Sequence, residues 1–113
     1  MILASPHIQK NYNVSANELR GYGILILTRF SCWFFEKIFE VSMMGRSLLL
    51  AEVINKDLIV ATAHFESLNN AKCRESQMNE TFDIIKRSGI KNSIVVGDYN
   101  FCSSWTSEES VLK

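Results

Sequence analysis

The apolar residues of this chain fall into short runs of strand length, separated by polar turns, with one longer periodic segment. GYGILILTRF at 21–30 has an unbroken apolar centre, which is typical of a strand buried on both faces. Residues 46–54 and 58–66 are also strand-like, and the Asn-Lys-Asp sequence at 55–57 supplies turn formers at hairpin length. The pattern therefore predicts an antiparallel pair of strands on either side of this turn.

The periodic segment, residues 69–88, predicts an amphipathic helix with its charges on the solvent side. Its apolar stripe consists of Ala71, Met78, Phe82 and Ile85. Asn69 or Asn70 can cap the start of this helix, and Gly89 stands where a left-handed residue often ends one. Residues 93–97, SIVVG, then predict another strand buried on both sides. Strands with a helix between them indicate a layered α/β domain.

Two segments have weaker patterns. Residues 1–20 are rich in turn formers, and Pro6 is expected to break any helix that begins at Ile2. Residues 31–44 could form a strand or a one-sided helix, and the periodicity does not decide between them. The aromatic cluster at 33–35 is expected in the core or in an interface.

Composition narrows the classes of protein to consider. A length of 113 residues, with 47% hydrophobic residues and no repeat or linker, predicts one domain. Twelve basic and twelve acidic residues cancel, which argues against binding nucleic acid by net charge alone. Three widely spaced cysteines indicate neither a disulfide framework nor a zinc site. Without a basic N-terminal region or an apolar run near ~18 residues, we expect an intracellular protein, nuclear or cytoplasmic.

Chemistry-bearing side chains collect where two predicted strands end. His64, Glu66 and Ser67 close the strand AHFES, while Asp98 and Asn100 close the strand VVGDYN. Residues two apart in a strand project to the same side. If the two strands are neighbours, an imidazole, a hydroxyl, a carboxylate and an amide converge, which suits positioning a water and stabilising charge on a phosphate.

Each of these residues also has a simpler interpretation. Asp98 and Asn100 can start a turn by bonding their own backbone. His64 can be a hydrogen-bonded structural histidine. Gly97 fits either interpretation, because it allows a close approach of the backbone.

Four motifs, taken in chain order, carry a resemblance to a known family. They are GYGILILTRF, MGRSLLLAEV, IVATAHFES followed by Arg74 and Gln77, and IVVGDYNF. Together they resemble the endonuclease/exonuclease/phosphatase superfamily. The H-x-E-S sequence at 64–67 and the GRSLL segment are most similar to its 5′-tyrosyl-DNA phosphodiesterase branch. The match covers about residues 21–105, so residues 1–113 are expected to form a single partial domain of this type.

This resemblance implies an α/β fold that is part of a four-layered β-sandwich flanked by helices, DNase I-like, with mostly antiparallel strands. It implies Mg²⁺-dependent hydrolysis of phosphodiester bonds in nucleic acid or a related phosphate ester, as in DNA repair nucleases. By resemblance, Asp98 activates the attacking water, Asn100 holds the phosphate and His64 stabilises the phosphoryl oxygens. Ser67 matches a substrate-binding serine of the branch, and no catalytic role is carried onto Arg74 or Gln77.

The chain also departs from the family pattern. The family's first-strand asparagine, its metal-binding glutamate and its closing serine-aspartate-histidine block have no match in family context within the 113 residues. Mg²⁺ relies on one or two well-placed carboxylates, so few ligands for it remain. Besides an unrelated small α/β binding module in which G-D-x-N occurs by chance, two interpretations stay open: an incomplete phosphodiesterase, or a non-catalytic remnant or regulatory fragment that acts by association. Self-association through exposed apolar faces is expected in either case.

Overall fold

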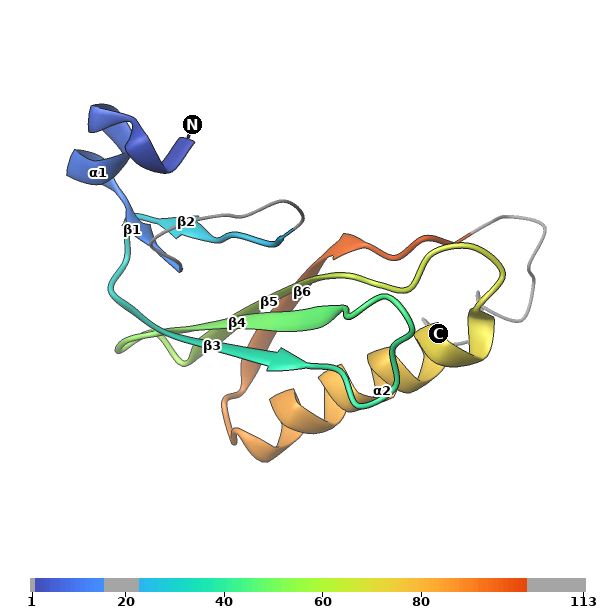
Figure 1. Ribbon diagram of the computed structural model, residues 1–113. Coiled ribbons are helices and arrows are strands. Elements are labelled where there is room, and N and C mark those ends of the chain that lie inside the picture. The colour runs from blue at the N-terminus through green and yellow to red at the C-terminus, as the bar shows by residue number, and fades with distance from the viewer. Residues whose placement is uncertain (1, 16–22, 102–113) are drawn as a thin grey trace.

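A computed structural model describes residues 2–15 and 23–101 of the chain. Cys102 and the two ends of the matched region, residues 21–22 and 102–105, lie outside the described residues. The described part is a mixed α/β structure with a four-stranded sheet, a two-stranded sheet and one long helix (Figure 1). None of the helices in this part is long and apolar enough to cross a membrane.

The main sheet has the strand order β3-β4-β5-β6. Its strands are β3 (Cys32–Ile38), β4 (Ser47–Val53), β5 (Leu58–His64) and β6 (Asn92–Asp98). The pairs β3–β4 and β4–β5 are antiparallel, so the predicted hairpin is confirmed, while β5 and β6 run parallel. Helix α2 (Ala71–Arg87) connects this parallel pair and lies along one face of the sheet (Figure 1).

The N-terminal region contains more helix than its sequence suggests. A 3₁₀ helix, η1 (Ile2–Ala4), precedes helix α1 (Pro6–Asn11). The helix that begins at Ile2 ends at Ala4, before Pro6, as expected, and Pro6 itself starts α1 in the first helical turn, where its missing N–H has no partner to lose.

A two-stranded sheet follows, formed by β1 (Asn13–Val14) and β2 (Leu27–Thr28) in antiparallel pairing. The strand predicted at 21–30 is thus confined, among the described residues, to β2, and its residues are half-buried rather than fully buried. The strand is this short because β1 pairs with it at only two positions, Asn13 with Thr28 and Val14 with Leu27.

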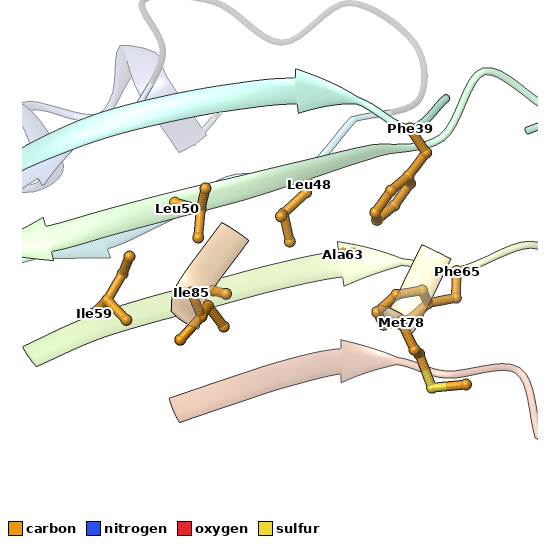
Figure 2. Close-up of a cluster of buried hydrophobic side chains, with 9 residues drawn as sticks. Phe39, Leu48, Leu50, Ile59, Ala63, Phe65, Met78 and Ile85 are labelled. Atoms are coloured by element: carbon orange, nitrogen blue, oxygen red, sulfur yellow. The ribbon is translucent and has the colours of Figure 1, made fainter. Parts of the chain in front are cut away.

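The core lies between α2 and the face of the main sheet that it covers (Figure 2). Nine buried residues form it, from β4, β5, α2 and the positions directly after β3 and β5: Phe39, Leu48, Leu50, Ile59, Ala61, Ala63, Phe65, Met78 and Ile85. The rings of Phe39 and Phe65 stack with centroids 5.8 Å apart, and Tyr99 extends the stack at 5.0 Å from Phe65. This stack places the end of β5 and the residues after β6 in one packed unit.

Apolar residues of the two edge strands are less buried than predicted. Residues 31–44, for which the sequence does not decide between strand and helix, contain strand β3. Trp33 and Phe35 in this strand are 63% and 56% exposed, so they do not belong to the core. In β6, Val95 packs on the core while Ile94 and Val96 are about half exposed, at 49% and 50%. Since neighbours in a strand alternate faces, Ile94 and Val96 point away from α2. The expectation that β6 is buried on both sides is therefore wrong.

Gly97 is required where β6 passes closest to β5. Its φ is +155°, and a Cβ at this position would stand 2.2 Å from the carbonyl oxygen of Ala63. The close backbone approach expected of Gly97 is thus present, and no side chain fits there.

Helix α2 ends as the sequence predicts but begins differently. Gly89 follows the helix with a φ of +73°, the left-handed conformation that favours glycine. Asn70 is the N-cap residue, yet its side chain makes no capping hydrogen bond and donates instead to the carbonyl oxygen of Ser67, at 2.8 Å. The cap expected from its side chain is therefore absent.

A buried polar centre forms where β5 ends. The carboxylate of Glu66 is fully buried and accepts hydrogen bonds from Ser42 Oγ at 2.9 Å and from the backbone N–H groups of Met43 and Met44 at 2.9 and 2.7 Å. Gln77 Nε2 donates to the same group at 3.1 Å. Burial raises the pKa of Glu66 and is the largest influence, but these hydrogen bonds together lower the pKa below its ordinary value of 4.5.

The buried face of α2 is polar where it meets this centre. Arg74 Nη1 donates to the carbonyl oxygens of Glu66 and Leu68 at 2.8 and 2.6 Å, and Gln77 Oε1 accepts from the backbone N–H of Glu66 at 2.9 Å. The prediction of a charged outer face is thus wrong for Arg74, which is fully buried, whereas Phe82 is 40% exposed. The helix turns these polar side chains inward because the strand end below them has backbone groups to satisfy.

The first prediction concerns Gly97. Replacing it with alanine should lower the free energy of unfolding by about 3 kcal/mol, because the new Cβ overlaps backbone rather than a movable side chain. Gly89→Ala is the matched control, since its φ is also positive but nothing lies within 4 Å of the added Cβ. We expect this control to cost only about 1 kcal/mol. Denaturant unfolding measures both, and equal losses would contradict the close contact.

The second prediction concerns acid stability. The pKa of Glu66 is lower in the folded chain, so the unfolded chain takes up its proton first as the pH falls. The stabilisation from Glu66 should be complete above about pH 5 and should disappear as the pH drops through the folded pKa. Free energies of unfolding between pH 3 and pH 7 should therefore fall more steeply for the wild-type chain than for Glu66→Gln. Parallel curves for the two proteins would show that the carboxylate is not held in its charged form.

Candidate functional site

The parallel pairing of β5 and β6 brings the two predicted strand ends together. His64 and Asp98 are register partners at the last position of the two strands. His64 Nε2 lies 3.4 Å from Asp98 Oδ2, and both side chains remain open to solvent, with 42% and 62% exposed. The sequence therefore places this imidazole and this carboxylate correctly at one edge of the sheet.

Ser67 and Asn100 join the same cluster. Asn100 Nδ2 donates to the carbonyl oxygen of Phe65 at 2.7 Å and to Ser67 Oγ at 3.3 Å. The backbone N–H of Phe65 in turn donates to the carbonyl oxygen of Asp98 at 2.9 Å. The four candidate residues thus occupy one compact region, in which the Asn100 amide ties the segment after β6 to the segment after β5.

Asp98 also makes the turn that its sequence context suggests. Its Oδ1 accepts a hydrogen bond from the backbone N–H of Asn100 at 2.9 Å, and Asn100 has a φ of +54°. This is the local side-chain-to-backbone bond typical of aspartate in turns. The two carboxylate oxygens of Asp98 therefore have different partners, one in the turn and one at His64.

Arg46 completes the cluster and was missed by reasoning from strand ends alone. Its Nη1 lies 2.8 Å from His64 Nδ1, and its Nη2 donates to Ser67 Oγ at 2.9 Å. It comes from the loop before β4, on the far side of β5 from Asp98. The available signal was the GRSLL segment, which places an arginine directly before a buried strand that adjoins β5.

Contact with Arg46 determines the protonation pattern of the imidazole. A guanidinium group can only donate, so in this contact His64 Nδ1 accepts and the ring N–H is at Nε2. That proton then faces Asp98 Oδ2. The line Arg46–His64–Asp98 therefore runs from a cation, through the imidazole ring, to a carboxylate.

A pocket of about 310 Å³ adjoins this cluster. Arg46 and His64 line it together with apolar and polar groups from the neighbouring segments, among them Ile24, Glu36, Ile38 and Met44. The pocket is wide enough for a small group that carries both a charge and an apolar part. Its position beside Arg46 makes that end of the pocket suited to an anion.

The described residues do not fit a magnesium site. No group of three or more His, Cys, Asp or Glu side chains in residues 2–15 and 23–101 is placed to hold a metal ion. Both oxygens of Glu66 are already engaged by donors of the protein itself in a fully buried position. Among the described residues of the cluster, Asp98 supplies one exposed carboxylate, whose oxygens lie against the Asn100 N–H and His64, and this is fewer ligands than Mg²⁺ sites commonly use.

Comparison with known proteins gives matches of structure only. A scan of protein-family models finds no match, and neither does a search of curated proteins. The fold is similar to a humanized TDP2 from D. rerio, with a TM-score of 0.67 and 25% identity over 91% of this chain. It is also similar to D. rerio TDP2 complexed with a single-strand DNA product (TM-score 0.68, 23% identity, 93% of this chain) and to TDP2 from C. elegans (0.64, 19%, 87%).

The match is partial on the side of the known proteins. The chain spans 47%, 46% and 34% of the lengths of these three structures, so less than half of each. Within this chain the likeness extends over nearly all of the residues, including the antiparallel-dominated sheet and the helix that connects its parallel pair. The resemblance to the 5′-tyrosyl-DNA phosphodiesterase branch is confirmed as a likeness to part of these TDP2 structures.

Proposed function

We propose that this chain is the central part of a phosphodiesterase domain of the TDP2 type, and that its own residues bind and orient a phosphate group of a nucleic acid strand. The observation that carries this proposal is the cluster at the ends of β5 and β6. It combines the Arg46 cation with the hydroxyl of Ser67 and the Nε2–H of His64. These are the kinds of donors that recognise phosphate oxygens.

The likeness to a TDP2 structure that holds a single-strand DNA product supports a nucleic acid as the source of the phosphate. The net charge of zero supports a local contact rather than binding along an extended basic surface. Within the proposal, residues 1–113 form part of a four-layered sandwich, of which the described sheet and α2 are two layers. The remaining layers would come from the parts of a TDP2-type domain that have no counterpart in this chain.

We assign roles to the cluster as follows. Arg46 and Ser67 donate hydrogen bonds to the phosphate oxygens, and the exposed Nε2–H of His64, which lies 3.4 Å from Asp98 Oδ2, can share its hydrogen bond with the same group. Asp98 is exposed at the open edge, where Oδ2 can accept a proton from a water molecule. Asn100 is engaged with the carbonyl oxygen of Phe65, so any contact of Asn100 with phosphate would use the other face of its amide. Hydrolysis would draw on metal ligands beyond the described residues, since these do not form a magnesium site.

The third prediction tests this binding role. The chain should bind a 5′-phosphorylated single-stranded oligonucleotide more tightly than the same strand with a 5′-hydroxyl, measured by fluorescence anisotropy. Arg46→Met should weaken binding of the phosphorylated strand about tenfold, because it removes charge-assisted hydrogen bonds. Arg87→Met is the matched control, since it deletes the same charge at an exposed position near the end of α2.

Two results would contradict the proposal. Equal binding of the two strands would show that the cluster does not recognise a terminal phosphate. Equal losses in the Arg46 and Arg87 variants would show that binding depends on overall charge. Cleavage of a phosphodiester by the purified chain that a chelator abolishes and Mg²⁺ restores would show instead that the chain assembles a complete metal site.

A second candidate function is a non-catalytic fragment that acts by association. The exposed apolar face of β6 favours it, because Ile94 and Val96 stand half exposed on an edge strand that lacks lysine and arginine. On this proposal the chain associates with a second copy or with another protein through β6.

The fourth prediction is that the chain self-associates at micromolar concentration, as measured by sedimentation velocity. The double variant Ile94→Thr, Val96→Thr should dissociate it, because threonine keeps the strand propensity and removes most of the apolar surface. Ile54→Thr is the control, an exposed apolar residue in the turn after β4. A monomer in the wild-type chain would rule out this surface as a self-association site.

A further inference from the structure

Glu66 belongs to the H-x-E-S segment, but its carboxylate bonds Ser42, Met43, Met44 and Gln77 and makes no such bond to the side chains of Arg46, His64 and Ser67. It is fully buried, and its partners come from the loop between β3 and β4 and from α2. This position is neither that of a solvated charge at a strand end nor that of a carboxylate with oxygens open to a metal ion. The question is therefore what a buried carboxylate does directly beside the candidate site.

The loop between β3 and β4 is held by Glu66 at three successive residues. The carboxylate accepts from Ser42 Oγ and from the backbone N–H groups of Met43 and Met44, within 2.9 Å in each case. Gln77 Nε2 bonds the carbonyl oxygen of Val41 at 3.0 Å and so secures the start of the same loop. The loop thus wraps around one carboxylate.

Ser42 links the Glu66 carboxylate to the backbone of Arg46 by two hydrogen bonds. Its Oγ donates to Glu66 and accepts from the backbone N–H of Arg46 at 2.9 Å. The carbonyl oxygen of Arg46 accepts from the backbone N–H of Phe39 at 3.0 Å, which closes the loop at its base. Two hydrogen bonds therefore connect the Glu66 carboxylate to the backbone of the residue that carries the guanidinium.

Placing the Arg46 side chain against His64 and Ser67 has a cost in free energy. Its Nε is buried and, among the described residues, has no hydrogen-bond partner. A buried donor without a partner costs free energy, so the bonds of Nη1 and Nη2 to His64 and Ser67 are made against an opposing cost. A fixed loop lowers the entropy that the side chain must lose to make them.

The geometry requires a carboxylate rather than an amide. Four donors converge on the two oxygens of Glu66, and only an ionised carboxylate has acceptors on both sides. Glutamine would turn an NH₂ group toward at least one of these donors, which repels it. The substitution Glu66→Gln therefore releases part of the loop while keeping the volume of the side chain.

We propose that Glu66 is a positioning residue that, through the loop 41–46 and Ser42, holds Arg46 against His64 and Ser67 and thereby sets the tautomer of His64. Its part in phosphate binding rests on the function proposed above, whereas the tautomer and the order of the loop do not. Glu66 contacts no substrate in this scheme. It acts on the site only by fixing where Arg46 stands.

The fifth prediction tests this with the full chain, using ¹⁵N NMR in solution or by magic-angle spinning. The sequence has two histidines, so the His64 signals are identified by comparison with His7→Gln. In the wild-type chain His64 should be predominantly the Nε2–H tautomer. In Glu66→Gln it should become a mixture, and amide hydrogen exchange at Met43 and Met44 should speed up about tenfold, as expected for the loss of one charge-assisted hydrogen bond.

Thr81→Val is the matched control. Thr81 is also fully buried, and its hydroxyl bonds the Gln77 carbonyl oxygen at 2.8 Å within α2, without contact to the loop. Thr81→Val should destabilise the chain and leave the His64 tautomer unchanged. If Glu66 had a purely structural role, Glu66→Gln would give this same result. Arg46→Ala provides the reference spectrum of a His64 that has lost its donor.

Ser42→Ala keeps the proposal testable if Glu66→Gln fails to fold, because Ser42 is only half-buried and its change is small. It should shift the tautomer in the same direction. A wild-type His64 spectrum in the folded Glu66→Gln or Ser42→Ala chain, or in Arg46→Ala, would overturn the proposal. Failure of the wild-type chain to bind the phosphorylated strand would remove the proposed function but leave this test intact.

Discussion

The buried carboxylate of Glu66 fixes the relative positions of three separate segments of the chain. A charge removed from water must be surrounded by donors, and here the donors are the hydroxyl and backbone N–H groups of the β3–β4 loop together with the amide of Gln77 on α2. Each donor satisfies the carboxylate and is itself satisfied by it, so a shift of one segment leaves several groups unpaired at once. The polar centre at the end of β5 therefore holds these segments in place, where an apolar contact would not fix their positions as closely.

The parallel pairing of β5 and β6 gives the second constraint. Helix α2 carries the chain back so that both strands end at the same edge, which puts His64 opposite Asp98 without any long loop. The close approach is set by Gly97, because a side chain there would push β6 away from the Ala63 carbonyl oxygen. The separation of the imidazole and the carboxylate therefore depends on a residue that has no side chain.

Reasoning from sequence succeeds where a feature is local or follows from strand direction. The hairpin around 55–57, the helix ending at Gly89 and the meeting of His64 with Asp98 are of this kind. It fails where burial depends on what a distant segment needs. Arg74 is buried while Phe82 is 40% exposed, because a backbone carbonyl at the end of β5 requires a hydrogen-bond donor. The pattern of apolar residues along the helix gives no sign of this requirement.

Arg46 and β6 show two further limits of the sequence. Arg46 contacts His64 from a loop whose path is set by Glu66, so the GRSLL segment places the arginine near β5 but does not reveal the contact. The composition of β6 is that of a buried strand, yet burial requires a covering layer, and the described residues place none over Ile94 and Val96. In both cases the missing information is the position of a second segment, not the preference of the first.

Asp98 shows that the structural and the chemical interpretations of a strand-end pair need not compete. One carboxylate oxygen accepts from the backbone of Asn100 and makes the turn, while the other lies toward the Nε2 of His64. An asparagine could supply the first acceptor, but its NH₂ group at the second position would face a ring N–H that also donates. The turn alone would accept either residue, whereas a His64 whose Nδ1 accepts from Arg46 presents its Nε2–H to Asp98 and so requires both oxygens of that side chain to be acceptors.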